Sequence, residues 1–448
     1  MSGLVEYCLN SVVADIIDNT LGNEFLLRIR KLLRLSSFSV ASSSFTCDLP
    51  LNFHSAASKY PPAKPYGIHT SRRACGVGRK LTLYRRDLLV GGGHRPDAGA
   101  VRGRTAGKRG RYLVERLVAY GGKGVSVRQL GGNRAGEMRI ARFLHNPKVT
   151  VGEMMSAALE RTCAQAGSRH VLAIQDTSAL RVDEKGLGLS FHPVIAVDAD
   201  AGTVLGLIDN IFLTRKGGEK ALRKERDFAQ KDSRRWLNGA ERAGALAAAG
   251  AACVTVVEDR EGDIYDCFAF KPATVEKLVR AAQDRCLADG STLFAKAGEW
   301  DEAGRMMVEL PAAPGRKARR AELAVRFGKV EIVRPKARKT DAALPATVVL
   351  TLVIGREINP AEGQEPALWF LLTTHRVGDI ADARRIIGFY RLRWTIEQLF
   401  RTMKTKGFAV EALRQEQDGP LEKLVTAILI AAVKVVNSLA IMALTQIW

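Results

Sequence analysis

Cysteine and histidine are scarce in this 448-residue chain, and they are scattered along it. The seven cysteines contain no C-x-x-C pair, and the seven histidines do not cluster with them in the sequence. Zinc modules and disulfide frameworks both depend on recognisable cysteine spacing. The pattern therefore predicts neither a zinc module nor a disulfide framework.

The sequence also lacks the signals of secretion and of membrane insertion. Residues 1–20 have no basic start followed by a long apolar run, so no secretory signal is predicted. Residues 424–444 are strongly apolar, but Lys434 and Asn437 fall near the centre of this segment. Such interruptions favour a buried helix over a membrane span. We expect a cytoplasmic protein with no membrane partner.

Acidic residues are fewer than basic ones, and the formal net charge is +21. A field of this sign attracts polyanions, and the neutralisation of phosphates makes such binding salt-dependent. Much of the excess lies before residue 113, in runs such as residues 102–111. The composition therefore favours a nucleic-acid partner without specifying which one.

Residues 1–112 differ from the remainder of the chain. Apart from a helix-like stretch at residues 5–35, they show a Ser-rich run at 36–44 and Gly/Arg-rich sequence at 91–110. Little of this has the periodicity that buries a core. We expect an atypical, basic and partly disordered segment.

Two aspartates follow short apolar runs that are typical of buried strands. Asp176 comes directly after residues 171–175, and Asp259 follows residues 253–258. Each strand would deliver a carboxylate at its end, although an aspartate at such a place often only caps the next helix. Three neighbours remain open as the second functional acid: Glu258, Glu261 and Asp263.

Residues 390–404 read as one amphipathic helix. At 100° per residue, five polar side chains fall within an arc of roughly 80°: Tyr390, Arg393, Glu397, Arg401 and Lys404. The opposite face carries an apolar stripe: Leu392, Ile396, Leu399 and Met403. The bland interpretation is a solvated charged face. A single carboxylate among cations and a phenol instead suits a site that handles phosphate.

The spacing Tyr390-x2-Arg393-x3-Glu397-x6-Lys404 resembles the signature of the hairpin-forming DDE transposases of bacterial insertion sequences, in the IS-four group. This resemblance implies that Asp176, Asp259 and Glu397 form a catalytic triad that binds two Mg²⁺ ions, with Mn²⁺ as a substitute. Hard divalent cations prefer such oxygen ligands, and a pair of them promotes in-line displacement at phosphorus.

The resemblance also implies which residues bind DNA. Tyr390, Arg393 and Lys404 would contact phosphates near the cleaved end, and Arg401 shares their face. Trp369 would stack on a base that flips out during hairpin formation, although a tryptophan among leucines is more often a core residue. Arg280 would lie near the scissile phosphate.

The expected fold is α/β. Predicted strands at residues 171–176, 193–197 and 203–207 precede a helix at 228–249 and the strand that ends at Asp259, which is the order of a ribonuclease-H-like core. By resemblance, a helical DNA-binding region occupies residues 113–167, since the motifs at 129–133 and 142–147 are similar to that domain. The core would span residues 168–289 and 366–448, with a β-rich insertion at 290–365 and a shortened C-terminal helix.

The predicted function is that of an insertion-sequence DNA transposase, which cleaves and rejoins DNA through a hairpin intermediate. Its partners would be the terminal inverted repeats, target DNA and a second copy of the chain, and it would associate with the nucleoid. Two alternatives remain. One is a ribonuclease-H-like nuclease without strand transfer. The other is a degenerate copy that only binds DNA, which the unusual start and the abrupt end at Trp448 favour.

Overall fold

The computed structural model describes residues 104–120, 125–182, 188–215, 232–310, 318–339, 341–360, 362–404, 407–413 and 418–445. Most of the atypical segment predicted at residues 1–112, together with Trp448, lies outside these described residues. Residues 97–448 form one compact unit. The architecture below is that of this unit.

One mixed sheet runs through the molecule and begins with three antiparallel strands. β1 lies beside β3, and β3 pairs with both β4 and the short β2. β5 and β6 follow on the other side of β1 and run parallel to it. This arrangement agrees with the predicted ribonuclease-H-like core. The bounds are β1 His170–Gln175, β2 Ser178–Val182, β3 Gly188–Asp198, β4 Val204–Arg215, β5 Cys253–Glu258 and β6 Glu276–Arg280.

The strands predicted as a β-rich insertion continue this same sheet. β10 (Leu368–Thr373) pairs antiparallel with β6, and β9, β8 and β7 follow in that order. Their bounds are β7 Gly304–Leu310, β8 Arg319–Val333 and β9 Thr347–Ile358. β10 thereby ties the inserted strands to the core, because its residues hydrogen-bond to β6 on one side and to β9 on the other.

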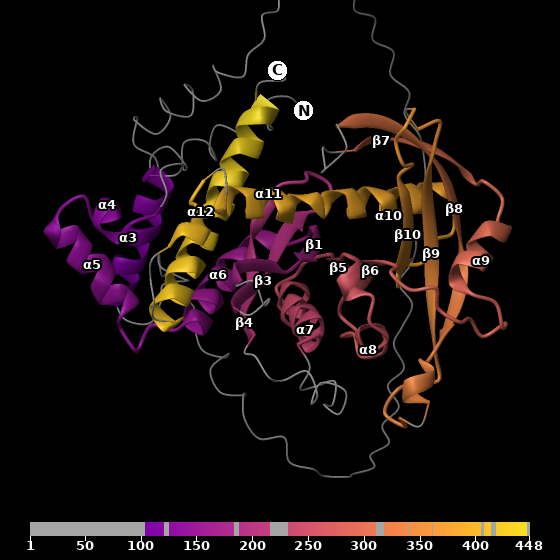
Figure 1. Ribbon diagram of the computed structural model, residues 1–448, viewed down its shortest axis with the longest axis horizontal. Helices are drawn as coiled ribbons and strands as arrows, with labels where there is room; N and C mark the ends of the chain where they lie inside the picture. Colours follow the sequence, from indigo (N-terminus) through magenta and orange to yellow (C-terminus); the bar gives the residue numbers. More distant parts are fainter. Residues whose placement is uncertain are drawn as a thin grey trace, which may run out of the picture. The chain divides into compact units, whose positions relative to one another are not determined.

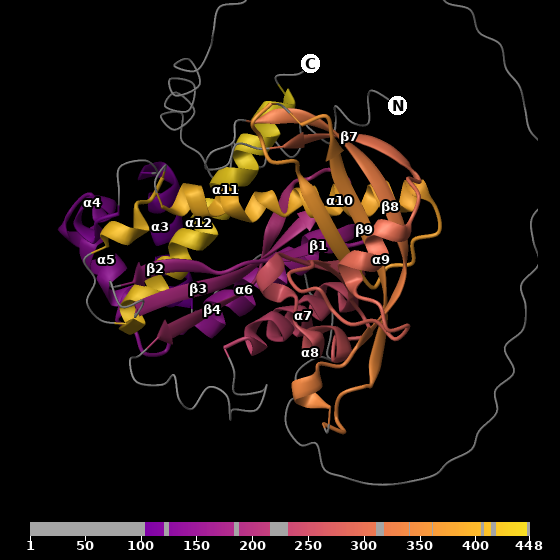
Figure 2. The same ribbon diagram turned by 45° about the vertical axis from the view of Figure 1, so that its right-hand side comes forward.

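Side chains along β1 alternate between the two faces of the sheet, as the period of a strand requires. Val171 and Ala173 enter a core shared with α7 (Arg234–Ala248). His170 points the other way, with its ring 4.6 Å from that of Phe389 on α10 (Ile380–Leu392). Figures 1 and 2 show α7 on one side of the strands, with α10 and α11 (Trp394–Met403) along the other.

Among the described residues, four helices precede the sheet: α3 (Arg104–Tyr120), α4 (Val127–Gly131), α5 (Arg134–Leu144) and α6 (Val151–Ala166). The motif at residues 129–133 forms the tight junction between α4 and α5. Gly132 takes φ 71°, a left-handed conformation that suits glycine, and the side chain of Asn133 accepts a hydrogen bond from the N–H of Gly136. The motif therefore specifies this turn directly.

The long helix α12 (Asp418–Thr445) joins these helices to the core. It packs against α3, α5, α6, α11 and β4, and Lys423 donates hydrogen bonds to the carbonyls of Leu144 and Asn146 at the end of α5. Leu424, Ile428 and Ala432 are buried in this packing. None of the helices in the described part of the chain has the length and apolarity of a membrane span.

The prediction of a single helix over residues 390–404 is wrong at Arg393. The α-helical ladder is interrupted there by tighter bonds, from the N–H of Arg393 to the carbonyl of Tyr390 and from that of Ile396 to the carbonyl of Arg393. Ile396, Leu399 and Met403 are buried as predicted, whereas Leu392 is only half-buried. Tyr390, expected on the polar face, is also buried.

Shorter elements complete the connections: the helices α8 (Tyr265–Ala269) and α9 (Leu293–Glu299), and the 3₁₀ turns Arg260–Gly262, Lys336–Arg338 and Val410–Ala412. The first of these turns directly follows β5, where the side chain of Asp259 accepts a hydrogen bond from the N–H of Glu261. Asp259 thus caps its own turn.

A substitution in α7 tests how closely this helix must approach β1. A Cβ atom added at Gly239 would lie 2.0 Å from Oε1 of Gln175, which is buried and hydrogen-bonded. We expect Gly239→Ala to lower the free energy of unfolding by about 1–3 kcal/mol, as overpacking does. Gly388→Ala in α10 is the matched control, since nothing lies within 4 Å of its added Cβ. Equal stability of the two variants in urea unfolding would contradict this packing.

Candidate active site

Three carboxylates from separate elements converge at one end of the sheet. Asp176 directly follows β1 and Asp259 directly follows β5, and these two strands are parallel neighbours with Ile174 opposite Val257. Their carboxyl ends therefore meet at the same edge. Glu397, on α11, completes the group, because its charge and that of Asp259 both act on Asp176. The structure thus brings the three predicted acids together.

The clustering of acids changes the ionisation of Asp176. Burial, and then the neighbouring charge of Asp259, raise the pKa of Asp176 to about 7, while Arg393 and the N–H of Thr177 act against this rise. Negative charge is therefore only partly compensated at this edge. A bound cation would relieve the repulsion, and all three side chains offer the oxygen ligands that hard divalent cations prefer.

Arg393 lies between two of these acids. Its Nη1 is 3.1 Å from Oδ2 of Asp176, and its Nη2 hydrogen-bonds to Oε1 of Glu397. Burial disfavours the charged guanidinium, yet Tyr390, Glu397 and Asp176 together raise the pKa of Arg393 above its usual value. Only 13% of the Arg393 side chain is exposed, so its guanidinium is held in place between the two acids.

The other acids around Asp259 are occupied elsewhere. Glu258, which points to the opposite face of β5, receives hydrogen bonds from Nζ of Lys277 at 2.5 Å and from Nε2 of Gln175 at 2.6 Å. Glu261 pairs with Arg235 at 3.0 Å on the surface. Asp263 accepts from the buried Arg285 at 2.6 Å. The charge of Asp259, in contrast, acts on Asp176 and raises its pKa.

Residues 92–433 match the family model described as a transposase DDE domain. The chain belongs to this transposase family. The match covers more than half of the chain and includes every element of the sheet. Membership establishes that the chain is a DDE transposase, an enzyme of DNA transposition and recombination that acts as a nuclease and takes DNA as its substrate.

A buried polar network supports the acids of the transposase from the other face of the sheet, and it was not predicted from the sequence. Gln175 also donates to the carbonyl of Trp236 at 2.9 Å, and its Oε1 lies 3.1 Å from Nε2 of His192. Nδ1 of His192 is 2.9 Å from the hydroxyl of Thr177. The chain of contacts thus reaches the residues on both sides of Asp176. The one sequence signal for this network is Glu258, an acid at the end of the apolar strand β5.

Trp369, Tyr390 and Arg280 form a second group beside the acids of the transposase. Trp369 is half-buried on β10, and its ring meets that of Tyr390 edge-on, at 5.6 Å and 66°. Tyr390 hydrogen-bonds to Arg280, and Nη2 of Arg280 donates to the carbonyl of Leu368 at 3.0 Å. Burial raises the pKa of the Tyr390 phenol, so it stays protonated near neutral pH.

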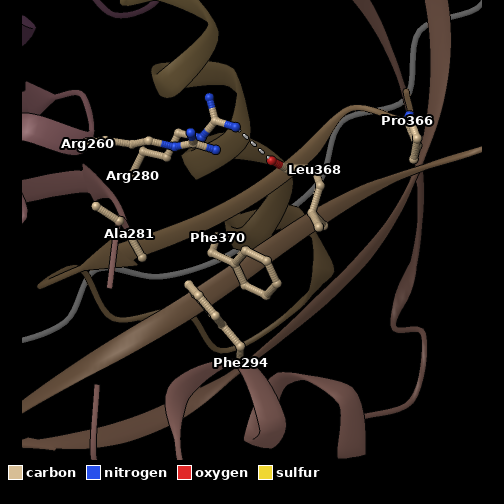
Figure 3. Close-up of a pocket in the computed structure, with 8 residues that line it drawn as sticks. Arg260, Arg280, Ala281, Phe294, Pro366, Leu368 and Phe370 are labelled. Atoms are coloured by element: carbon tan, nitrogen blue, oxygen red, sulfur yellow. Dashed lines mark hydrogen bonds between the residues drawn. The ribbon is translucent and has the colours of Figure 1, made fainter. Parts of the chain in front are cut away.

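A cavity of about 380 Å³ opens next to this group. Figure 3 shows the guanidinium groups of Arg260 and Arg280 at one side of it, and the rings of Phe294 and Phe370 facing each other at the other side. The two rings are 4.6 Å apart. Cationic and aromatic side chains thus line the same hollow in the transposase.

Two predicted DNA-binding residues lie apart from the acids. Lys404 pairs with Glu411 at 3.0 Å between its Nζ and Oε1, and the guanidinium of Arg401 lies 5.3 Å from the ring centre of Trp394. Arg401 is exposed, and Lys404 is half-buried. Both lie at the C-terminal end of α11, beyond Glu397.

The raised pKa of Asp176 predicts how stability depends on pH when metal is removed by EDTA. Between pH 4 and 7 the unfolded chain releases a proton that folded Asp176 retains, so rising pH destabilises the folded state. Asp176→Asn removes this effect. We expect wild type to lose stability relative to the variant by at most roughly 1.4 kcal/mol per pH unit in this window. Urea unfolding with parallel pH profiles for the two proteins would contradict the interpretation.

Proposed function

We propose that this transposase moves an insertion sequence by a cut-and-paste reaction with a DNA hairpin intermediate. The observation that carries the proposal is the convergence of Asp176, Asp259 and Glu397 from three elements at one edge of the sheet. The basic and aromatic groups around that edge add what a simple nuclease does not need. Trp369 and Tyr390 are the clearest of these.

The three acids fit a pair of Mg²⁺ ions, for which Mn²⁺ can substitute. The donor set consists of carboxylate oxygens alone, which hard divalent cations prefer, and the charge of Asp259 adds to burial in raising the pKa of Asp176. When bound, such ions supply a Lewis acid that activates the attacking oxygen and stabilises the leaving one. The contribution of the chain is to hold the carboxylates at fixed strand ends and on one helix face.

Cations of the chain itself orient the DNA. Arg393 lies at the acids, where its guanidinium meets a phosphate that enters the site. Arg280 is held beside it through the hydroxyl of Tyr390 and faces the cavity. Lys404 and Arg401 continue the basic surface for the flanking backbone. Water attacks the phosphodiester first, and the 3′-hydroxyl that it releases attacks next. Each nucleophile displaces a DNA oxygen directly, so no protein-linked DNA intermediate forms.

Trp369 is the residue that we assign to hairpin formation. Its half-buried ring faces Tyr390, on the side of the sheet that carries the acids. Stacking against an exposed aromatic face stabilises an unpaired base without regard to its identity. A base that leaves the duplex as the hairpin closes therefore finds a partner within the same site.

The helices α3 to α5 are our candidate for recognition of the terminal inverted repeats. α3 carries Lys108, Arg109 and Arg111 before its buried stretch at Leu113 and Leu117. A basic helix on a small packed unit suits contacts to the DNA backbone. A second copy of the chain would bind the other end of the element. Because both partners are then chromosomal DNA, the enzyme would associate with the nucleoid.

Substitution of the acids tests the catalytic assignment. Labelled DNA bearing the inverted repeats that flank the gene is incubated with the full chain and Mg²⁺ or Mn²⁺, and the products are separated on a denaturing gel. We expect hairpin-ended cleavage by wild type and only background with Asp176→Asn, Asp259→Asn or Glu397→Gln. Breaks without hairpins would instead indicate a nuclease, and DNA binding without cleavage a degenerate copy.

Glu261→Gln is the matched control for the second acid. Glu261 lies two residues from Asp259, but its side chain is 62% exposed and pairs with Arg235. We expect this variant to cleave at the wild-type rate. Cleavage that survives Asp259→Asn but not Glu261→Gln would show that Glu261, and not Asp259, is the second acid. Circular dichroism checks that each variant is folded.

The assignment of Trp369 predicts a selective loss. Trp369→Ala should slow hairpin formation by about 5- to 150-fold, since stacking of a base is worth ~1–3 kcal/mol, and should leave the first nick intact. Trp369→Phe keeps an aromatic face and should retain most hairpin formation. A fluorescent base analogue near the cleaved end reports unstacking directly. Equal loss of nicking and hairpin formation in Trp369→Ala would show that the residue is structural.

A further inference from the structure

A second cluster of metal-binding side chains lies at the opposite ends of the strands that carry the acids. His170 is the first residue of β1, and Cys253 is the first residue of β5. The parallel register places these two residues directly opposite each other. His375, just beyond β10, completes the cluster. Residues far apart in the sequence are therefore neighbours here.

The three side chains converge closely. One ring nitrogen of each histidine and the thiol sulfur all lie within 4.8 Å of one another. The hydroxyl of Thr255 is 2.8 Å from Nε2 of His170 and 2.8 Å from Nε2 of His375. Cys253 hydrogen-bonds to the same hydroxyl. One oxygen, with a single proton to donate, thus serves three groups.

We propose that His170, Cys253 and His375 bind a Zn²⁺-type cation at a site distinct from the catalytic acids. Two imidazoles and a thiolate are the ligands that zinc prefers, whereas Mg²⁺ selects oxygen. All three residues are half-buried, which shields the site and still admits an ion. The donor chemistry therefore separates this site from the cluster of Asp176, Asp259 and Glu397.

The geometry needs only small side-chain movements to hold the ion. Zn–N bonds of roughly 2.0–2.1 Å and Zn–S bonds of roughly 2.3 Å place tetrahedral ligand atoms about 3.5 Å apart. Rotation of the three side chains closes the remaining gap, and water fills the fourth position. Binding releases the thiol proton of Cys253 to solvent. Thr255 then keeps its hydroxyl as a hydrogen-bond partner for the ring nitrogens that do not bind metal.

The surroundings support a metal site and limit its role. The ring centres of His170 and His375 are 5.8 Å apart, close enough for both imidazoles to reach one ion. Phe389 packs edge-on against His170 at 4.6 Å and fixes one side of the cluster. The bound ion would join β1, β5 and the end of β10, and so act as a cross-link at the edge away from the chemistry.

Metal content and cobalt spectroscopy test the proposal with the full chain. Each protein is saturated with Zn²⁺, dialysed and analysed by plasma mass spectrometry. A parallel sample is titrated with Co²⁺ to follow thiolate charge-transfer and d–d absorption. We expect wild type to retain one equivalent of Zn²⁺ more than Cys253→Ser or His375→Ala, and Cys253→Ser to lose the charge-transfer band. Zinc should also raise the melting temperature of wild type more than that of Cys253→Ser or His375→Ala.

Control variants separate this site from other ligands in the chain. Cys286→Ser removes an exposed thiol outside the cluster, and His145→Ala removes an exposed imidazole, so both should keep the extra equivalent. Asp259→Asn should keep it too, and excess Mg²⁺ should not displace it. Equal zinc content in wild type and Cys253→Ser would overturn the proposal, as would a cobalt spectrum without thiolate character. If Cys253→Ser fails to fold, His375→Ala decides by the same criterion.

Discussion

The buried ion pair between Lys277 and Glu258 is the contact on which the geometry of the active site depends. Both side chains are fully buried, and a buried charge without its partner is strongly destabilising. Glu258 also receives a hydrogen bond from Gln175. The pair therefore links the carboxyl ends of β1 and β5 to Lys277, near the start of β6. The residues that follow Gln175 and Glu258 in the chain are Asp176 and Asp259, the two aspartates of the candidate site, so this network fixes the strand ends from which they project.

Consecutive residues of a β-strand face opposite sides of the sheet, so neighbours in the sequence have different surroundings. Gln175 and Glu258 face α7 and carry the structural network, while Asp176 and Asp259 follow one position later and turn to the face of α10 and α11. The same alternation sets His170 and Cys253 on that second face, at the other ends of β1 and β5. The strands β1 and β5 thus carry carboxylate side chains at one end and an imidazole and a thiol at the other.

The sequence predicted the features that local patterns encode. Apolar runs located the strands before Asp176 and Asp259, and helical spacing placed Glu397 with Arg393. The break at Arg393 was missed because the helical spacing of residues 390–404 runs through it and no Gly or Pro marks it in the sequence. Alternation within residues 253–259 already implies that Glu258 and Asp259 face opposite sides. The meeting of His170, Cys253 and His375 depends on strand order, which no short motif records.

Arg393 shows how the site balances stability against function. Burial of Asp176, and then the charge of Asp259, raise the pKa of Asp176, which is the cost of holding these acids together at one edge. The guanidinium offsets part of it by pairing with both Asp176 and Glu397. If Arg393 also binds a DNA phosphate, as we propose, that phosphate competes with the acids for the guanidinium. A cation bound to the acids would then favour DNA binding, because it frees Arg393 from them.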